Sequence, residues 1–309
     1  MITQITLSDS ESRWNTIASK NSAEVPFVTW RWHINWNNIF GLPYEPLYLL
    51  IDDAVIAPFV KKDYSVIFSG GEEIADYLDI IGPDKEKPKA WTQIIRYLRQ
   101  HNIKSLSLRN VPQHSPTVEY FKKYRQSIIQ KEDTTPTETL PHSWDTYVEA
   151  IHSPKHRHEL ERKVRKFERE HAPLRIYQSE HPDRDIRILL ELMEKNEKKR
   201  TFLTPSMEQF FRETASAFEK NISLLLLSVG DIYVAATLSF VYGNAYYLYN
   251  SGFDKATYPN AGFYLKAMSI RHAIEHGYTT YNFLQGNERY KYELGGNDSF
   301  VYSITLPLT

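Results

Sequence analysis

Apolar and polar residues alternate along this chain in short blocks, and the spacing within each block predicts a strand or a helix. Apolar runs at 48–51 and 54–60, separated by Asp52-Asp53, predict a β-hairpin. Helical spacing of apolar residues predicts helices over 87–101, 154–170, 184–199 and 205–219. Short strands are expected at 2–7, 64–68, 104–108, 174–178 and 300–306. This mixture of strands and helices predicts an α/β (α+β) protein.

The pattern is most regular over residues 224–291. Two strand-like runs meet at Gly230-Asp231, a third follows Gly243-Asn244, and another strand is expected over 279–284. Before that last strand, a Pro/Asn/Gly turn at 258–262 opens a helix with apolar residues at helical spacing. A β-meander followed by a turn, a helix and a strand is one way to build a cradle for a phosphorylated acyl donor. We therefore take this stretch as the centre of the protein.

One segment interrupts the pattern and predicts a domain boundary. Residues 131–141 read KEDTTPTETLP, with two prolines and four threonines, which is typical of a linker. We expect one domain over 1–135 and a second over 141–309, and the last strand can pack back on the first domain. The two halves carry elements in a similar order, without a residue-level repeat.

Composition narrows the possible functions. Among 309 residues, 37 Lys and Arg balance 38 Asp and Glu, which argues against a dedicated nucleic-acid binder. The absence of cysteine excludes disulfides, thiolate metal sites and cysteine nucleophiles. The first residues lack the pattern of a signal peptide, and no apolar run is long enough to span a bilayer. We expect a soluble, cytoplasmic protein that binds neither DNA nor a membrane by a spanning helix.

Two polar segments within 224–291 are candidates for chemistry. Free N–H groups at the helix that starts near 258–262 can bind a phosphate, although an ordinary loop entering a packed helix explains the same residues. The second segment, 282–291, follows a strand end. There Glu288 can act as a general base, Tyr290 as an acid toward a leaving thiolate, and Lys291 can bind phosphate or carboxylate. A solvated polar loop is the alternative.

Other motifs have simpler explanations. The charged run 154–170 can form a basic face over an anionic substrate, but a solvated amphipathic helix with internal ion pairs is the favoured explanation. Histidines 152, 156 and 158 lack the further ligands of a metal site, so we expect no metal. Tryptophans 30, 32 and 36 can line a carbohydrate groove, and core packing is the safer interpretation. No Walker loop, dinucleotide-binding turn or nucleophile elbow is present.

Several of these segments together resemble a known family. The runs YYLYNSGFD at 246–254, YP at 258–259 with Gly262, and NFLQGNERYK at 282–291 resemble the BioF2-like, CelD-type acetyltransferases. That group belongs to the GNAT superfamily and is similar to the FemAB/FemX peptidyltransferases. Weaker matches extend upstream, to Trp144 with the basic run 157–169, and to Ser69-Gly70 with DYLD at 76–79.

The resemblance implies two tandem GNAT-like domains, each a mixed, mostly antiparallel sheet flanked by helices, with the acyl-transfer site in the second. It places the donor pyrophosphate, from acetyl-CoA or another acyl-CoA, at Pro259, Asn260, Ala261, Gly262 and Phe263. It implies catalytic roles for Glu288, Tyr290 and Lys291. Acceptor contacts would come from Tyr249, Asn250, Asn282, Gly286 and Arg157. Asn282 stands where the family usually has Asp.

The expected function is therefore transfer of an acyl group from acyl-CoA to an amine or hydroxyl of a sugar, polysaccharide precursor or related metabolite. A Fem-like transferase that uses charged tRNA and a cell-wall precursor is the first alternative. A GNAT-like module that binds a partner or glycan without catalysis is the second.

Overall fold

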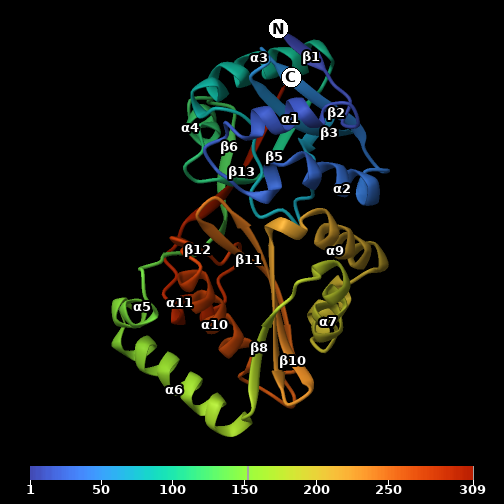
Figure 1. Cartoon of the computed structure of the whole chain (residues 1–309). Helices are drawn as coiled ribbons and strands as arrows, with labels where there is room; N and C mark the ends of the chain where they lie inside the picture. Colours follow the sequence, from blue (N-terminus) through green and yellow to red (C-terminus); the bar gives the residue numbers. More distant parts are fainter. Residues whose placement is uncertain (152, 309) are drawn as a thin grey trace. The chain divides into compact units, whose positions relative to one another are not determined.

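The chain divides into two compact units, Met1–Thr134 with Ser299–Thr309 and Thr135–Asp298. The computed structural model describes residues 1–151 and 153–308, so His152 lies outside the described residues. Figure 1 shows the elements of both units. Because the last strand belongs to the first unit, the second unit is an insertion in the sequence of the first.

The first unit is built on a seven-stranded sheet with the order β1-β2-β3-β4-β5-β13-β6. All its neighbouring strands are antiparallel except β4 and β5. Its elements are β1 (Ile2–Gln4), α1 (Glu11–Ala18), η1 (Pro26–Val28), α2 (Trp30–Phe40), β2 (Glu45–Ile51), β3 (Val55–Lys62), β4 (Ser65–Phe68), η2 (Asp84–Glu86), α3 (Lys87–Gln100), β5 (Ser105–Pro112), α4 (Pro116–Lys122), β6 (Ile128–Thr134) and β13 (Phe300–Pro307).

The second unit has a six-stranded sheet with the order β7-β12-β11-β10-β9-β8. Here β11 and β12 are the parallel pair. Its elements are β7 (Thr137–Thr139), α5 (Trp144–Ala150), α6 (Pro154–His171), β8 (Leu174–Gln178), α7 (Pro182–Glu194), α8 (Glu197–Phe202), α9 (Pro205–Ala217), η3 (Glu219–Asn221), β9 (Ile222–Val229), β10 (Ile232–Tyr242), β11 (Ala245–Phe253), α10 (Ala261–Glu275), β12 (Thr280–Asn282) and α11 (Arg289–Glu293).

Local sequence signals explain many of these boundaries. Asp52 and Asp53 both take positive φ, 50° and 52°, and the β2–β3 hairpin predicted about them is confirmed. Ser143 and Thr204 cap α5 and α9 through their side-chain oxygens, and proline follows Thr204 in the first helical turn. Trp32 and Trp36 are buried, which confirms core packing rather than an open carbohydrate groove for these two side chains.

Two sequence predictions were wrong in detail. The boundary between the two units lies within residues 131–141, after Thr134. The segment does not form a loop-like linker, however, since β6 pairs with β13 and β7 pairs with β12 within it. Threonine-rich sequence suits a pleated strand, and this preference outweighs the two prolines. The single helix predicted over 184–199 is also interrupted. Asn196 accepts a hydrogen bond from the Lys199 N–H and so begins a separate helix, α8.

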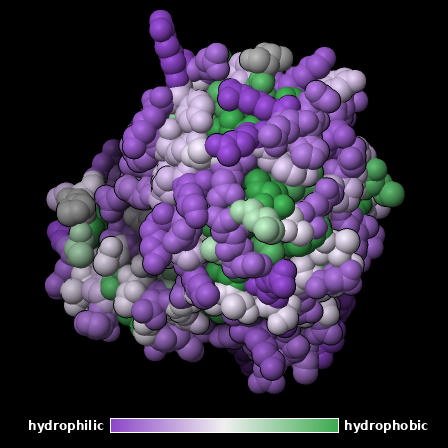
Figure 2. All heavy atoms as spheres, turned by 90° about the horizontal axis from the view of Figure 1, so that it is seen from above, coloured by the Kyte–Doolittle hydropathy of each residue, from purple (hydrophilic) through white to green (hydrophobic). Residues whose placement is uncertain are grey.

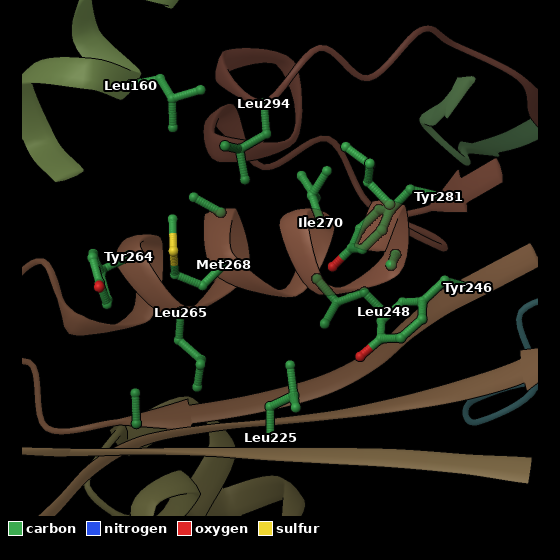
Figure 3. Packing of buried hydrophobic residues seen from close by; sticks show 14 of the residues in the cluster. Leu160, Leu225, Tyr246, Leu248, Tyr264, Leu265, Met268, Ile270, Tyr281 and Leu294 are labelled. Carbon is green, nitrogen blue, oxygen red and sulfur yellow. The ribbon is translucent and has the colours of Figure 1, made fainter. Parts of the chain in front are cut away.

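The core of the second unit lies on both sides of helix α10. Leu265 points toward Leu225 and Leu248 on the sheet, whereas Met268 points away from the strands toward Leu160 and Leu294, as Figure 3 shows. On the opposite face of the sheet, α7 packs on β10 and β11 and also on α9. The sheet is therefore covered on both faces, which explains the unbroken apolar run of β9.

The molecular face in Figure 2 is mainly hydrophilic, with apolar residues in small separate groups. In the part of the chain that the structure describes, no helix is long and apolar enough to cross a membrane.

Candidate active site

The parallel strands β11 and β12 separate after a short pairing, and we call the point of separation the fork. Pairing runs from Ala245↔Thr280 to Tyr247↔Asn282, after which β11 continues to Phe253 and β12 ends. Asn282 ends β12 through its side chain, because its Oδ1 accepts the Leu284 N–H at 2.8 Å and Leu284 takes a φ of 57°. Asn282 thus shapes the end of the strand, whereas its acceptor contact stays a prediction.

A β-bulge lies on β11 beside the fork. Leu238 pairs with Asn250 and Ser239 pairs with Leu248, so Tyr249 is the extra residue that the β10–β11 register skips. A bulge bends its strand and redirects the side chains around it. The Tyr249 ring packs on Phe240, with 5.1 Å between the ring centroids.

Helix α10 begins next to the end of β11. Tyr258, Pro259 and Asn260 form the entering turn, with the Ala261 N–H bonded to Tyr258 O. The N–H groups of Gly262 and Phe263 donate to no other described residue. Free N–H groups at a helix start attract anions. The residues predicted to hold the donor, 259–263, therefore form the turn and the first residues of α10.

Gly262 has a packing role at the same place. A Cβ atom there would lie 2.6 Å from the ring of Phe253 at the end of β11. Glycine therefore allows the helix start to lie directly against the strand. A bulky residue at Gly262 would disturb this contact as well as any ligand, so such a variant is a poor test of ligand binding.

The loop after the fork is organised by Lys291. Its Nζ donates to Leu284 O at 3.0 Å and to Gln285 O at 2.5 Å, and it lies 3.0 Å from Glu288 Oε2. An ammonium has three N–H donors, so these partners occupy all of them. The Lys291 side chain is only 2% exposed, whereas that of Glu288 is 58% exposed. Lys291 therefore orders the loop and presents the Glu288 carboxylate to solvent.

Gly286 makes this arrangement possible. Its φ is 112°, and a Cβ atom would lie 2.5 Å from Glu288 Oε2. Only glycine adopts this backbone conformation without strain and leaves room for the carboxylate. The predicted residues Gly286, Glu288 and Lys291 are therefore in direct mutual contact.

Two further lysines, which the sequence reasoning missed, lie beside this loop: Lys266 is buried and Lys199 is partly buried. Lys266 is 6% exposed, and its Nζ lies 4.5 Å from the ring centroid of Tyr290 and 5.6 Å from that of Phe253. Its one hydrogen bond, to Gly262 O, is long at 3.5 Å, and no described carboxylate pairs with it. Lys199 Nζ donates to Asn250 Oδ1 at 2.8 Å and to Ser251 O.

The surroundings change the pKa of each of these groups. Burial lowers the pKa of Lys266 to about 7; Lys199 adds to this shift and Glu288 opposes it. Burial also lowers the pKa of Lys199 to about 8, again opposed by Glu288. For Tyr290, burial and then Glu288 hold the pKa of the phenol well above its usual value. Perturbed groups that gather in one place are typical of functional sites.

A sequence signal for Lys266 exists. It stands three residues after Phe263 and four before Ile270, on the apolar side of the predicted helix, where an unpaired charge is expensive. Lys199 carried no such signal, because its position depends on the helix break at Asn196.

Arg157 does not join this group. Its Nη1 donates to Glu149 O at 3.4 Å, and it makes no hydrogen bond or ion pair with Glu288 or the buried lysines. Helix α6, which carries Arg157, contains internal ion pairs such as Arg162–Glu159 and Arg165–Glu161. These pairs favour the solvated amphipathic helix over a free basic face. The acceptor contact of Arg157 stays a prediction.

The first unit also has one parallel pair of strands. β4 and β5 pair only at Ser65↔Ser105 and Val66↔Leu106. Beyond that point Asn110 donates from Nδ2 to Glu72 O and Ala75 O, and its carbonyl accepts the Leu78 N–H. These bonds tie the later part of β5 to residues 72–78.

A pocket of about 370 Å³ remains in the first unit. Its polar end carries the ion pairs of Lys87 with Asp79 and Asp84. Two carboxylates against one ammonium make this end unfavourable for a phosphate. Among residues 1–151 and 153–308, no group of three or more His, Asp or Glu side chains can hold a metal ion.

Comparisons with known proteins bear on the domain and the fold. A family model for the acetyltransferase (GNAT) domain matches residues 154–292. No curated protein sequence matches the chain.

Solved structures match over nearly the whole chain. L-PGS from Bacillus licheniformis is 10% identical, with a TM-score of 0.65 and coverage of 99% of this chain and 93% of that one. FemX is 10% identical, with a TM-score of 0.62 and coverage of 98% and 96%. A tandem GNAT protein from the clavulanic acid biosynthesis pathway is 12% identical, with a TM-score of 0.55 and coverage of 100% and 98%. The expected fold is confirmed: the chain is an α/β protein with two mixed sheets flanked by helices, in the tandem GNAT-like arrangement, and residues 154–292 match the GNAT acetyltransferase domain.

Proposed function

We propose that this protein is a GNAT-type acyltransferase that moves an acyl group from acyl-CoA to an amine or hydroxyl of a sugar, polysaccharide precursor or related metabolite. One observation carries the proposal: the free N–H groups at the start of α10, Lys266, Lys199 and the Glu288 carboxylate gather at the fork of the second sheet. Within the superfamily, the motifs at 246–254 and 282–291 favour the BioF2-like, CelD-type group. The reaction would be cytoplasmic.

The donor would be held by charge and by backbone groups. Residues Pro259 to Phe263 would receive the pyrophosphate at the start of α10, where the N–H groups of Gly262 and Phe263 are free. Lys199 would add positive charge. The acyl group would lie in the fork, because β11 beyond Tyr247 is no longer paired with β12 and its backbone N–H groups on that side can polarise a carbonyl.

The acceptor would approach the donor carbonyl from the side of Glu288. This carboxylate is half exposed and fixed by Lys291, so it can orient an amine or hydroxyl. Tyr290 keeps its proton at neutral pH because burial and Glu288 raise its pKa, and it is the proposed proton donor to the leaving thiolate. Tyr249, Asn250, Asn282, Gly286 and Arg157 remain proposed acceptor contacts.

A Fem-like transferase that uses charged tRNA is the alternative. It gains support from the fold similarity to FemX and L-PGS over nearly the whole chain. The positive charge of Lys199 would attract the phosphates of a tRNA end as well as those of CoA. A GNAT-like module without catalytic activity is the third possibility, and it would bind no acyl donor.

Isothermal titration calorimetry with CoA, acetyl-CoA and an aminoacylated tRNA minihelix separates these functions. We expect CoA and acetyl-CoA to bind, and Lys199→Ala to weaken both at least tenfold. Lys198→Ala is the matched control, since Lys198 is an exposed neighbour on the same helix. Binding of the minihelix alone would support the tRNA-dependent alternative. No binding of any donor would contradict acyl transfer altogether.

A further inference from the structure

Lys266 is a buried amine without a counter-charge. Its side chain lies against the rings of Tyr290 and Phe253, and no described carboxylate pairs with it. A buried ammonium is costly unless an anion compensates it, so the neutral amine with its free lone pair is favoured. The amine projects from the first turns of α10, beside the proposed donor site.

Two charged side chains from the surrounding elements add to the effect of burial and lower the pKa of Lys266 further. Lys199 approaches from α8 and Lys291 from α11, and both disfavour a third positive charge. Glu288, which precedes α11, is the one carboxylate that opposes them. Phe253 from β11 and Tyr290 from α11 supply the apolar walls. Together these neighbours keep the pKa of Lys266 near 7, where an amine is an efficient base at neutral pH.

Glu288 is already engaged in an ion pair. Its Oε2 lies 3.0 Å from the Lys291 ammonium, and this contact fixes the carboxylate in place. Glu288 can therefore orient an acceptor, whereas the neutral amine of Lys266 offers a free lone pair.

We propose that Lys266 is the general base of the transfer reaction, a role that rests on the proposed acyltransferase function. As the acceptor nitrogen or oxygen bonds to the donor carbonyl carbon, its proton passes to Nζ of Lys266. The carbon–sulfur bond then breaks, and the leaving sulfur takes the hydroxyl proton of Tyr290. The Lys266 ammonium then releases its proton to solvent, and the Tyr290 phenolate takes up one proton from solvent. One proton has then moved from the acceptor to the sulfur, and both side chains are restored.

The first test observes the proton on Lys266 directly. Protein labelled with ¹³C at the lysine Cε is titrated by NMR, and the resonance lost in Lys266→Met assigns the side chain. We expect a midpoint between about pH 6.5 and 8. Lys87 is the internal control: its ion pairs with Asp79 and Asp84 outweigh burial and raise its pKa, so its resonance should remain that of an ammonium throughout. A midpoint for Lys266 above pH 9 would overturn the proposal.

The second test measures release of free CoA from acetyl-CoA, with water as the acceptor. Lys266→Met should lower kcat about 100-fold with little change in KM, and should abolish the rise of kcat between pH 6 and 8. Lys266→Arg keeps a cation that cannot act as a base, so it should be equally impaired. A wild-type pH profile in both variants would overturn the role of Lys266 as general base. If the wild type releases no CoA, that result would count against acyl-CoA as the donor. The NMR titration would then still test whether Lys266 is neutral near pH 7.

Discussion

The Nζ atom of Lys291 lies 3.0 Å from Oε2 of Glu288 and also donates to the carbonyls of Leu284 and Gln285. One side chain therefore fixes the loop and its carboxylate together. Lys291→Met should cost about 2–3 kcal/mol of unfolding free energy, because it leaves two loop carbonyls without their donor. Urea unfolding measures this cost. Arg289→Met, which removes an exposed partner of Glu293, is the control and should cost less than 1 kcal/mol. Equal costs would show that Lys291 does not hold the loop.

Gly286→Ala should displace the Glu288 carboxylate, because the added methyl group would lie against it. The φ of 112° and the 2.5 Å approach to Glu288 Oε2 predict a loss of about 1–3 kcal/mol, together with reduced turnover. Gly277→Ala is a matched control, since Gly277 also has positive φ, 78°, but nothing lies within 4 Å of its Cβ position. It should lose some stability and no activity. Full activity of Gly286→Ala would mean that the position of Glu288 is unimportant.

Glu288→Gln and Tyr290→Phe test the proposed chemistry. Each should lower the rate of CoA release from acetyl-CoA about 100-fold, while thermal unfolding stays close to wild type. Arg289→Gln changes the exposed residue between them and should leave the rate unaltered. Unchanged rates in both Glu288 and Tyr290 variants would remove these residues from the mechanism.

The burial of Lys266 predicts a pH-dependent stability. A lysine in the unfolded chain has a pKa near 10.5, and burial lowers that of Lys266 to about 7. Between these values the unfolded chain binds a proton that the folded chain does not, so stability falls as the pH drops from 10.5 to 7 and then levels off. Relative to the wild type, the unfolding free energy of Lys266→Met should therefore be higher at pH 7 than at pH 10 by on the order of 3 kcal/mol. Urea unfolding at both values measures the difference, with Lys198→Met as the exposed control.

Glu138, in a different part of the second unit, should make stability depend on pH in the opposite sense. Burial raises the pKa of this carboxyl to about 7, against the opposing hydrogen bond from Asn297. The folded chain therefore binds a proton that the unfolded chain releases between pH 4.5 and 7, and stability falls as the pH rises through this window. Thermal unfolding of Glu138→Gln should lose this slope between pH 5 and 7. An unchanged slope would assign it to other groups.

Sequence patterns predicted most of the elements because local signals determine them. The hairpin at Asp52-Asp53, the caps at Ser143 and Thr204, and the strand at residues 174–178 all follow from neighbouring residues. The segment 131–141 was misjudged because its strands form by pairing with β13 and β12, which lie far away in the sequence. Long-range pairing leaves little local trace.

The sequence predicted which segments form the candidate site, but it did not predict the lysines that lie beside them. The helix start at 259–263 and the loop with Glu288 carry recognisable turns and motifs. The importance of Lys199 and Lys266 comes from burial by distant segments, and residue type alone does not reveal the loss of water around an amine. The internal role of Lys291 depends on the path of residues 284–288, which no periodicity specifies.

The place of β13 has a consequence for how this chain folds during synthesis. β13 lies between β5 and β6, so the first sheet lacks an interior strand until residues 300–307 have been made. The second unit ends at Asp298 and has its whole sequence available earlier. Domains generally fold as units once their sequence is complete. In this chain the unit that starts the sequence is therefore the one whose folding finishes last.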